Sequence, residues 1–277
     1  MRFAYLITAY DNAEHLVALV NRLCPPGTRD VAIIHIDAKS DLRHQAGAIA
    51  AANPAVRLVA RPVAVHWGHA NMLKAIRLLL REAMGHDFTH AHLISGSDWP
   101  LVSRERRVAE FGNRCWIEAV SGVQAERMEV RRFDSRYLRP DPSKPFDWYR
   151  ARLLKELSFR LPRRTRRPFG EWHKGLSWWS LPRDVCETVL KEMDRGFAMG
   201  VFKGVIVGDE HAVQTIVAHH YPDRIERHRH FLRWPEGAAS PAWLTHADWA
   251  MARASDAWFA RKLSVVQAPF LLDEAAA

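Results

Sequence analysis

The sequence predicts an α/β fold with a mostly parallel, Rossmann-like sheet flanked by helices, and two observations predict it. Short, continuous apolar runs alternate with stretches that carry apolar residues at helical spacing over the first hundred residues. Two such runs on either side of one helix form a βαβ unit, which implies parallel pairing. The length of 277 residues and the 48% hydrophobic fraction suit one globular domain spanning 1–277.

Residues 3–9 form the first expected strand and residues 31–36 the second. A helix between them is predicted by four apolar residues on one helical face, namely Leu16, Leu19, Val20 and Leu23. Asp11 or Asn12 can cap this helix, and Pro25-Pro26-Gly27 ends it. Further strands are expected at 56–59 and 91–95, with an amphipathic helix between them that carries Met72, Ile76, Leu79 and Leu80 on one face.

The second half is less regular. Residues 126–168 are rich in Arg and Pro, and we expect an insertion of helices and loops there. After it, the pattern predicts a strand at 176–181 and helices at 183–193, at 212–218 and near 243–251.

The charge is strongly positive: 40 Lys and Arg stand against 31 Asp and Glu, a net +9. This surplus suits nucleic acids, anionic membranes or phosphate-bearing substrates without choosing among them. The run RLPRRTRRP can contact anionic lipid or a polyanion, or can be a solvated loop. No zinc-finger or RNA-binding signature accompanies it, so no nucleic-acid partner is expected.

Cysteine content and hydropathy exclude other classes. Three Cys without a CxxC pair argue against a disulfide framework or thiolate zinc and fit a reducing compartment. No apolar stretch approaches about 18 residues, so no membrane span is expected. His86 and His90 are four residues apart, but the segment leads straight into a strand, and we predict no metal site.

Polar residues follow three of the expected strands: Thr8 to Tyr10, Asp37 and Asp98. Ligands of parallel α/β sheets bind at the carboxyl ends of the strands, so these positions predict a site. Each Asp alone can equally be a helix cap or a turn residue.

Two further groups can carry chemistry. Glu210 follows Gly208-Asp209 at the start of a helix, where a carboxylate either complements the helix dipole or acts as a general base. Arg261 and Lys262 are either surface cations or a clamp on a leaving diphosphate. P-loop, GxGxxG, GxSxG and Asp-x-Asp motifs are all absent from the sequence.

Seven segments carry a resemblance, in this order: FAYLITAYDN, IIHIDAKSD, VHWGHANMLKAIRLLL, HLISGSDWPL, KGLSWWSLPRDVCETVL, GDEHAVQTIV and FARKL. Together, over residues 3–264, the chain resembles glycosyltransferase family 14. That family includes the core-2 and I-branching β-1,6-N-acetylglucosaminyltransferases and the peptide O-xylosyltransferases. The Arg-rich middle matches poorly.

The resemblance implies a glycosyltransferase-A type fold and an inverting transfer from a UDP-sugar to a glycan or glycoconjugate hydroxyl, as in surface polysaccharide synthesis. It implies no metal and no other cofactor, consistent with the missing Asp-x-Asp. Glu210 would be the catalytic base, and Arg261 and Lys262 would neutralise the departing diphosphate.

The resemblance also suggests the remaining site residues. The donor-binding candidates are Thr8, Ala9, Asp37, His66 and Trp67 on the nucleoside side, and Ser177, Trp178 and Ser240 near the donor sugar or diphosphate. Asp98 fits a recurrent family position and is either a further donor-binding residue or a structural one. The candidates for acceptor binding are Trp99, Arg132 and Arg136.

The chain also departs from the family pattern. Gly208 replaces a proline before Asp-Glu. Residues 234–252 offer no second diphosphate-binding Arg, so the Arg-Lys pair looks more like that of the xylosyltransferases. The identity of the donor sugar therefore stays open between GlcNAc and xylose. The anchor, stem and disulfides of eukaryotic members are missing. We therefore expect a compact cytoplasmic enzyme, with peripheral contact at the inner, anionic membrane face left open. A non-catalytic polyanion or membrane-surface binder and an inactive UDP-binding relative are the alternatives.

Overall fold

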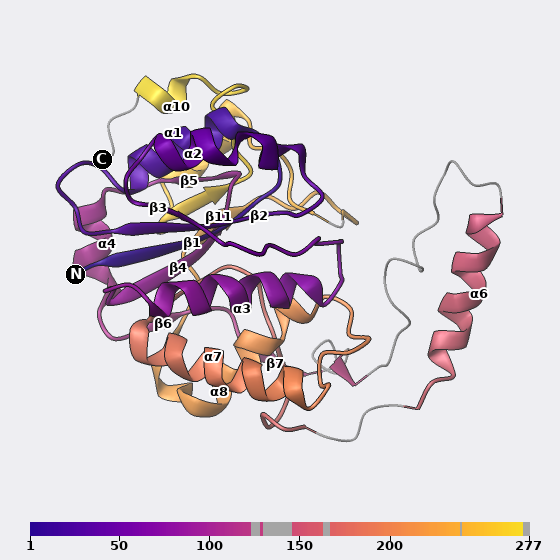
Figure 1. Ribbon diagram of the computed structural model, residues 1–277. Helices are drawn as coiled ribbons and strands as arrows, with labels where there is room; N and C mark the ends of the chain where they lie inside the picture. The colour runs from indigo at the N-terminus through magenta and orange to yellow at the C-terminus, as the bar shows by residue number, and fades with distance from the viewer. Residues whose placement is uncertain (123–127, 130–145, 163–166, 239, 274–277) are drawn as a thin grey trace.

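The computed structural model describes residues 1–122, 128–129, 146–162, 167–238 and 240–273. Its centre is a seven-stranded sheet with the order β10-β6-β9-β4-β1-β2-β3 (Figure 1). The strands are β1 (Phe3–Ala9), β2 (Val31–Ile36), β3 (Val56–Leu58), β4 (His90–Ser95), β6 (Cys115–Trp116), β9 (Trp179–Pro182) and β10 (Ile225–Glu226). β1 to β4 pair in parallel, and β9 is antiparallel to both β4 and β6. The predicted mixed α/β fold with a mostly parallel sheet is confirmed.

Helices cover both faces of this sheet. Figure 1 shows α1 (Ala13–Leu23) and α2 (Ala46–Ala51) on one face, and α3 (Asn71–Met84), α7 (Arg183–Ala198) and α8 (Ala212–His220) on the other. Side chains of β1 alternate between the two cores: Ala4 and Leu6 pack with α3, whereas Tyr5 and Ile7 pack with α1. Burial on both faces explains why the first strands are apolar throughout.

The register of the parallel strands creates one polar edge. Thr8 of β1 stands opposite His35 of β2 on one side and Ser95 of β4 on the other. The carboxyl ends of three strands therefore meet, and the polar residues that follow them come together.

A second, three-stranded sheet brings the end of the chain to this edge. It has the order β11-β12-β5 and consists of β5 (Asp98–Pro100), β11 (His230–Leu232) and β12 (Phe259–Arg261). β12 runs antiparallel to β5, with Arg261 opposite Asp98. A third sheet pairs β7 (Val120–Ser121) with β8 (His173–Lys174). Residues more than 150 positions apart thus become neighbours.

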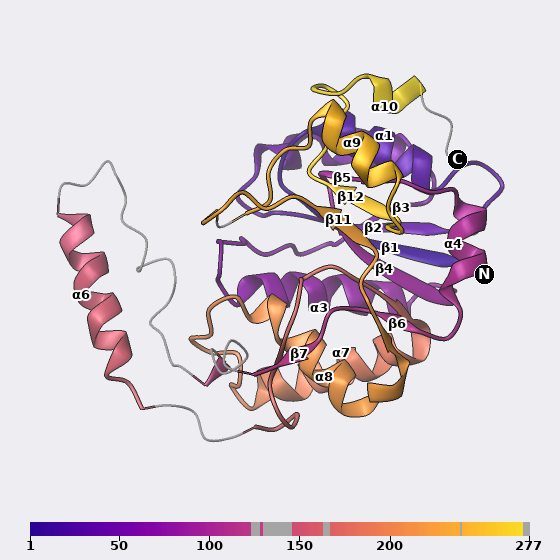
Figure 2. The same ribbon diagram turned by 180° about the vertical axis from the view of Figure 1, so that it is seen from behind.

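The remaining helices are peripheral or short. The α-helices are α4 (Arg104–Phe111), α6 (Asp147–Phe159), α9 (His246–Arg253) and α10 (Phe270–Asp273), and the 3-10 helices are Asp41–Gln45, Gly208–Glu210 and Pro222–Arg224. Figure 2, seen from behind, shows α9 and α10 near α1, and α6 standing apart from the body of the molecule. Among the described helices, none combines the length and apolar character required to cross a bilayer.

Three predicted boundaries were wrong, and the largest difference is at the end of the helix expected at 183–193, which continues to Ala198. The strand expected at 176–181 begins only at Trp179, because the preceding residues bond to other segments, as Leu176 does when its N–H donates to the Glu118 carboxylate at 3.0 Å. The helix expected from Trp243 begins at His246, because Thr245 and Asp248 form a reciprocal capping box. Most of the Arg-rich insertion, including Arg132 and Arg136, lies outside the described residues.

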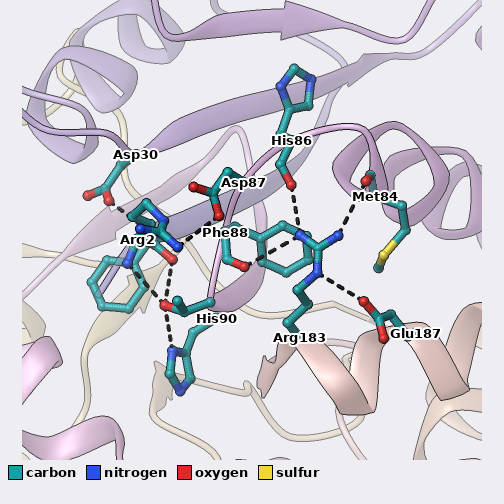
Figure 3. Close-up of polar contacts among 11 residues, drawn as sticks. Arg2, Asp30, Met84, His86, Asp87, Phe88, His90, Arg183 and Glu187 are labelled. Carbon is teal, nitrogen blue, oxygen red and sulfur yellow. Dashed lines mark hydrogen bonds and ion pairs between the residues drawn. The ribbon is translucent and has the colours of Figure 1, made fainter.

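The opposite edge of the main sheet is closed by structural ion pairs (Figure 3). Arg183, at the start of α7, stacks on Phe88 and donates to the carbonyl oxygens of His86 at 2.7 Å and Met84 at 3.3 Å. These contacts satisfy carbonyl groups at the end of α3, and Arg2 pairs with Asp87 at 2.8 Å beside them. The charged side chains at this edge therefore stabilise the fold by linking neighbouring segments.

Candidate active site

A cavity of about 420 Å³ opens at the carboxyl ends of β1, β2 and β4. Eleven residues that the sequence nominated line it together: Thr8, Ala9, Asp37, His66, Trp67, Ser177, Trp178, Glu210, Ser240, Arg261 and Lys262. They come from seven separate segments of the chain. The convergence of these residues is a result of the fold, because no two of the segments are continuous in sequence.

Asp37, which follows β2, stabilises the side of the cavity at the end of that strand. Its buried carboxylate accepts from the backbone N–H groups of Lys39 at 3.0 Å and Val65 at 3.3 Å, and from Lys39 Nζ at 2.9 Å. His35 adds a bond in which its Nε2 accepts from the Val63 N–H at 3.0 Å, and burial lowers the pKa of this imidazole so that it stays neutral. These bonds fasten the loop that presents His66 and Trp67 to the cavity.

The Lys39 ammonium also lies 4.2 Å from the centre of the Tyr10 ring. Tyr10 follows β1, is more than half exposed and lines the cavity. Its ring and the Asp37 carboxylate thus form one polar and aromatic corner at the ends of the first two strands.

Glu210 ends the Gly208–Glu210 turn, which precedes α8. Its carboxylate lies 3.5 Å from Lys174 Nζ, and its side chain is 26% exposed. Its carbonyl accepts from the Gly175 N–H at 2.9 Å. Glu210 thus lines the cavity with its carboxylate next to a cation.

Asp209, next to Glu210, links the Gly208–Glu210 turn to the segment that precedes β9. Ser177 Oγ donates to its carboxylate at 2.6 Å, and the Gln214 amide donates to the carbonyls of Leu176 at 2.6 Å and Asp209 at 3.2 Å. Removal from water raises the pKa of Asp209. Both acids of the Asp-Glu pair line the cavity, but they differ in their partners: the Asp209 carboxylate accepts from Ser177, whereas that of Glu210 lies beside Lys174.

Arg261 is held from three sides. Its guanidinium donates to Asp98 Oδ1 at 2.9 Å and to Ser97 Oγ at 3.1 Å, and it stacks on the Trp178 ring at 4.5 Å. Burial disfavours the ionised form of Asp98, but Arg261 and His230 outweigh it and leave the pKa of Asp98 below its usual range. Asp98 is fully buried, so it acts here on Arg261 and does not line the cavity.

Lys262 is less firmly held. Its ammonium donates to Ser240 Oγ at 3.1 Å. Burial and the neighbouring Arg261 charge lower the pKa of Lys262. Both effects weaken the preference of Lys262 for its charged form, and a bound anion would strengthen that preference.

Two residues that sequence reasoning did not connect with the site brace this cation pair. His15 Nε2 donates to the Asp98 carbonyl at 3.1 Å, while its Nδ1 accepts from the Val265 N–H at 3.1 Å. Asn12, which was expected to cap α1, does so and also donates to Ser264 Oγ at 2.6 Å. Nothing local signalled these roles, because the partners lie 83 residues away in Asp98 and 250 or more in Val265 and Ser264.

The acceptor-binding candidates fare differently. Trp99 is only 3% exposed and packs 5.4 Å from the His15 ring, so it belongs to the core and does not reach the cavity. The resemblance suggested an acceptor contact, but in β5 the Trp99 side chain packs into the core. Arg132 and Arg136 lie outside the described residues. Trp234 and Trp243, which are nearly half exposed, line the cavity instead.

Within the described part of the chain, no three His, Cys, Asp or Glu side chains gather as metal ligands. The positive charges that face the cavity come from Arg261 and Lys262. An α/β fold with an accessible acid and a cation pair around one cavity is the arrangement of a group-transfer enzyme.

Comparison with known families identifies the class. The family description "Core-2/I-Branching enzyme" matches residues 3–260, which is most of the chain and includes nearly every segment that lines the cavity. The chain therefore belongs to the Core-2/I-Branching enzyme family and is a glycosyltransferase of that type. No curated protein matches it significantly.

Proposed function

We propose that this enzyme transfers a sugar from a UDP-sugar to a hydroxyl of a glycan or glycoconjugate, with inversion and without a metal. The observation that carries the proposal is that Glu210 and the Arg261–Lys262 pair line the same cavity. An acceptor hydroxyl needs a base, a departing diphosphate needs positive charge, and both are available at one place.

The base step assigns Glu210 a single task. Its carboxylate takes the proton of the acceptor hydroxyl as that oxygen bonds to the anomeric carbon. The bond from this carbon to the diphosphate oxygen breaks on the opposite face, so the configuration inverts. The ion pair with Lys174, at 3.5 Å, positions this carboxylate beside the cavity.

The leaving group is received by Arg261 and Lys262. As the anomeric bond breaks, negative charge grows on the diphosphate oxygens, and preorganised cations stabilise it without further rearrangement. Arg261 is already partly neutralised by Asp98, so Lys262 supplies more of the uncompensated charge. Ser240, which accepts from Lys262, lies on the same wall.

The nucleoside half of the donor is assigned to the ends of β1 and β2. Thr8, Ala9 and Asp37 line that side of the cavity, and the loop held by Asp37 supplies His66 and Trp67. The donor sugar, GlcNAc or xylose, would sit between this region and Ser177 and Trp178. A thermal-shift series over UDP-sugars would choose between them, since a ligand that binds only the folded state raises the unfolding temperature.

We infer a reducing, cytoplasmic setting from the thiols. Cys24, Cys115 and Cys186 are free and buried. Burial raises the pKa of Cys24 and of Cys115 to about 12, so both remain inert thiols.

The proposal is tested by replacing Glu210 with Gln and measuring sugar transfer in EDTA. Loss of the base should reduce kcat by about 10²–10⁴-fold, while UDP affinity stays within a few-fold of wild type. Glu187→Gln, an exposed acid on α7, is the matched control. Wild-type turnover by Glu210→Gln would refute the base assignment, and loss of all wild-type transfer in EDTA would refute metal independence.

A further inference from the structure

Helix α6 and the residue that precedes it, Phe146, carry an exposed row of large apolar side chains. Phe146, Tyr149, Leu153 and Leu157 follow one another at intervals of three, four and four residues, which places them on one side of the helix. Their exposed fractions lie between 38% and 79%. Figures 1 and 2 agree that α6 stands away from the sheet and its covering helices.

The other long helices behave differently. α1 buries Leu16, Leu19 and Leu23, and α3 buries its own apolar face against the sheet. A contiguous apolar surface that the fold leaves in water is typical of a site that contacts a membrane or another molecule. The row on α6 is therefore a candidate contact surface.

The charge around this row is positive. α6 and the residue after it carry Arg150, Arg152, Lys155 and Arg160. Only Asp147 and Glu156 oppose them in this stretch, and the sequence from 163 to 167 adds four arginines. Arg and Lys can extend their long side chains from an apolar surface to phosphate groups while the stems stay buried. Exposed aromatic and aliphatic side chains among cations suit the headgroup layer of an anionic bilayer.

We propose that α6 docks this protein on an anionic membrane, with Phe146, Tyr149, Leu153 and Leu157 entering the headgroup layer. A second copy of the chain is a poorer occupant, because it would bring the same positive charges against each other. In both ribbon views α6 lies on the side of the molecule toward which the parallel strands run. Docking therefore turns the cavity side toward the bilayer. The proposal does not depend on the transfer reaction.

The first test is co-sedimentation of the full chain with vesicles of phosphatidylcholine containing 30% phosphatidylglycerol, compared with pure phosphatidylcholine. The wild type should bind the anionic vesicles and bind them less at high salt. Tyr149→Ser with Leu153→Ser should lower the partition coefficient by about tenfold or more. Met251→Ser with Val266→Ser removes two equally exposed apolar side chains elsewhere and should leave binding unchanged.

The second test reads the position of the helix directly. A polarity-sensitive fluorophore attached to Leu153→Cys should shift its emission to the blue on adding anionic vesicles, whereas one attached to Met251→Cys should not. The native cysteines are buried and do not compete for labelling.

The proposal is overturned if the wild type ignores anionic vesicles, or if the serine pair on α6 binds them as well as the wild type does. It is equally overturned if residue 153 shows no blue shift. A change in oligomeric state of the α6 variant, in a chain that does not bind vesicles, would instead identify α6 as a protein interface.

Discussion

Lys262 illustrates how a single residue can be prepared for a ligand. Burial and the adjacent Arg261 lower its pKa, which weakens the preference for its charged form until an anion binds. Arg261, by contrast, has a permanent partner in Asp98. The two neighbouring cations thus differ: Arg261 is held in a fixed position, whereas Lys262 supplies charge to a bound anion.

Replacing Lys262 with Met should weaken UDP binding by about 10- to 100-fold, because a charge-assisted hydrogen bond to phosphate is lost. In the wild type, UDP affinity should fall as the pH rises through the lowered pKa of Lys262, and the variant should lack this fall. Titration calorimetry with UDP at several pH values measures both effects. Lys203→Met, an exposed lysine outside the cavity lining, is the control. An unchanged affinity would remove Lys262 from the donor site.

At the level of elements, the site depends on how closely β8 packs against the segments that carry Glu118 and Glu210. Gly175 follows β8, and its N–H holds the Glu210 carbonyl. A Cβ at this position would stand 1.8 Å from the Glu118 carbonyl oxygen, so a side chain cannot be added without moving the backbone. The glycine therefore sets the distance between β8 and the turn that bears the base.

We expect Gly175→Ala to destabilise the protein by about 1–3 kcal/mol and to reduce kcat as well, because the displaced backbone carries Glu210 with it. Gly47→Ala is the control: that site in α2 has nothing within 4 Å, and alanine there should stabilise the helix by about 0.5–1 kcal/mol. Urea unfolding and transfer assays measure the two quantities. A Gly175→Ala protein with normal stability and kcat would contradict this account.

Across the whole molecule, buried histidines link stability to pH. Burial lowers the pKa of His15, His35, His90 and His92, and lowers that of His228 to about 4. His92 is fully enclosed by aromatic rings, and its Nδ1 is bonded to Ser180 Oγ at 2.7 Å. Each of these side chains is neutral in the folded protein at pH 7.

A histidine whose folded pKa lies below its unfolded value of 6.5 contributes full stability above pH 6.5, and this is lost as the pH falls below it. Below this pH the histidines of the unfolded chain bind protons, whereas the buried histidines of the folded chain do not. The free energy of unfolding should decline as the pH falls below 6.5, by at most about 1.4 kcal/mol per pH unit for each such histidine. His92→Gln should make the decline shallower in urea unfolding followed at several pH values, whereas His44→Gln, an exposed control, should not. Equal slopes for His92→Gln and wild type would exclude His92 as a contributor.

The sequence alone determined much of the local structure and the identity of the residues that can carry the chemistry. Apolar runs such as 31–36 match the observed strand exactly at both ends because burial on both faces leaves a continuous hydrophobic signal. Glu210, Arg261 and Lys262 were identified from their motifs and from the resemblance, and the family is confirmed. Their catalytic roles stay predictions.

Only the tertiary structure decided how these residues are held. Asp98 was nominated as a donor contact, yet the antiparallel pairing of β5 with β12 buries it beneath Arg261. The same pairing sends Trp99 into the core, and His15 reaches Val265 across 250 residues. Such contacts depend on strand register and sheet topology, which join distant segments and leave no periodic trace in the sequence around either partner.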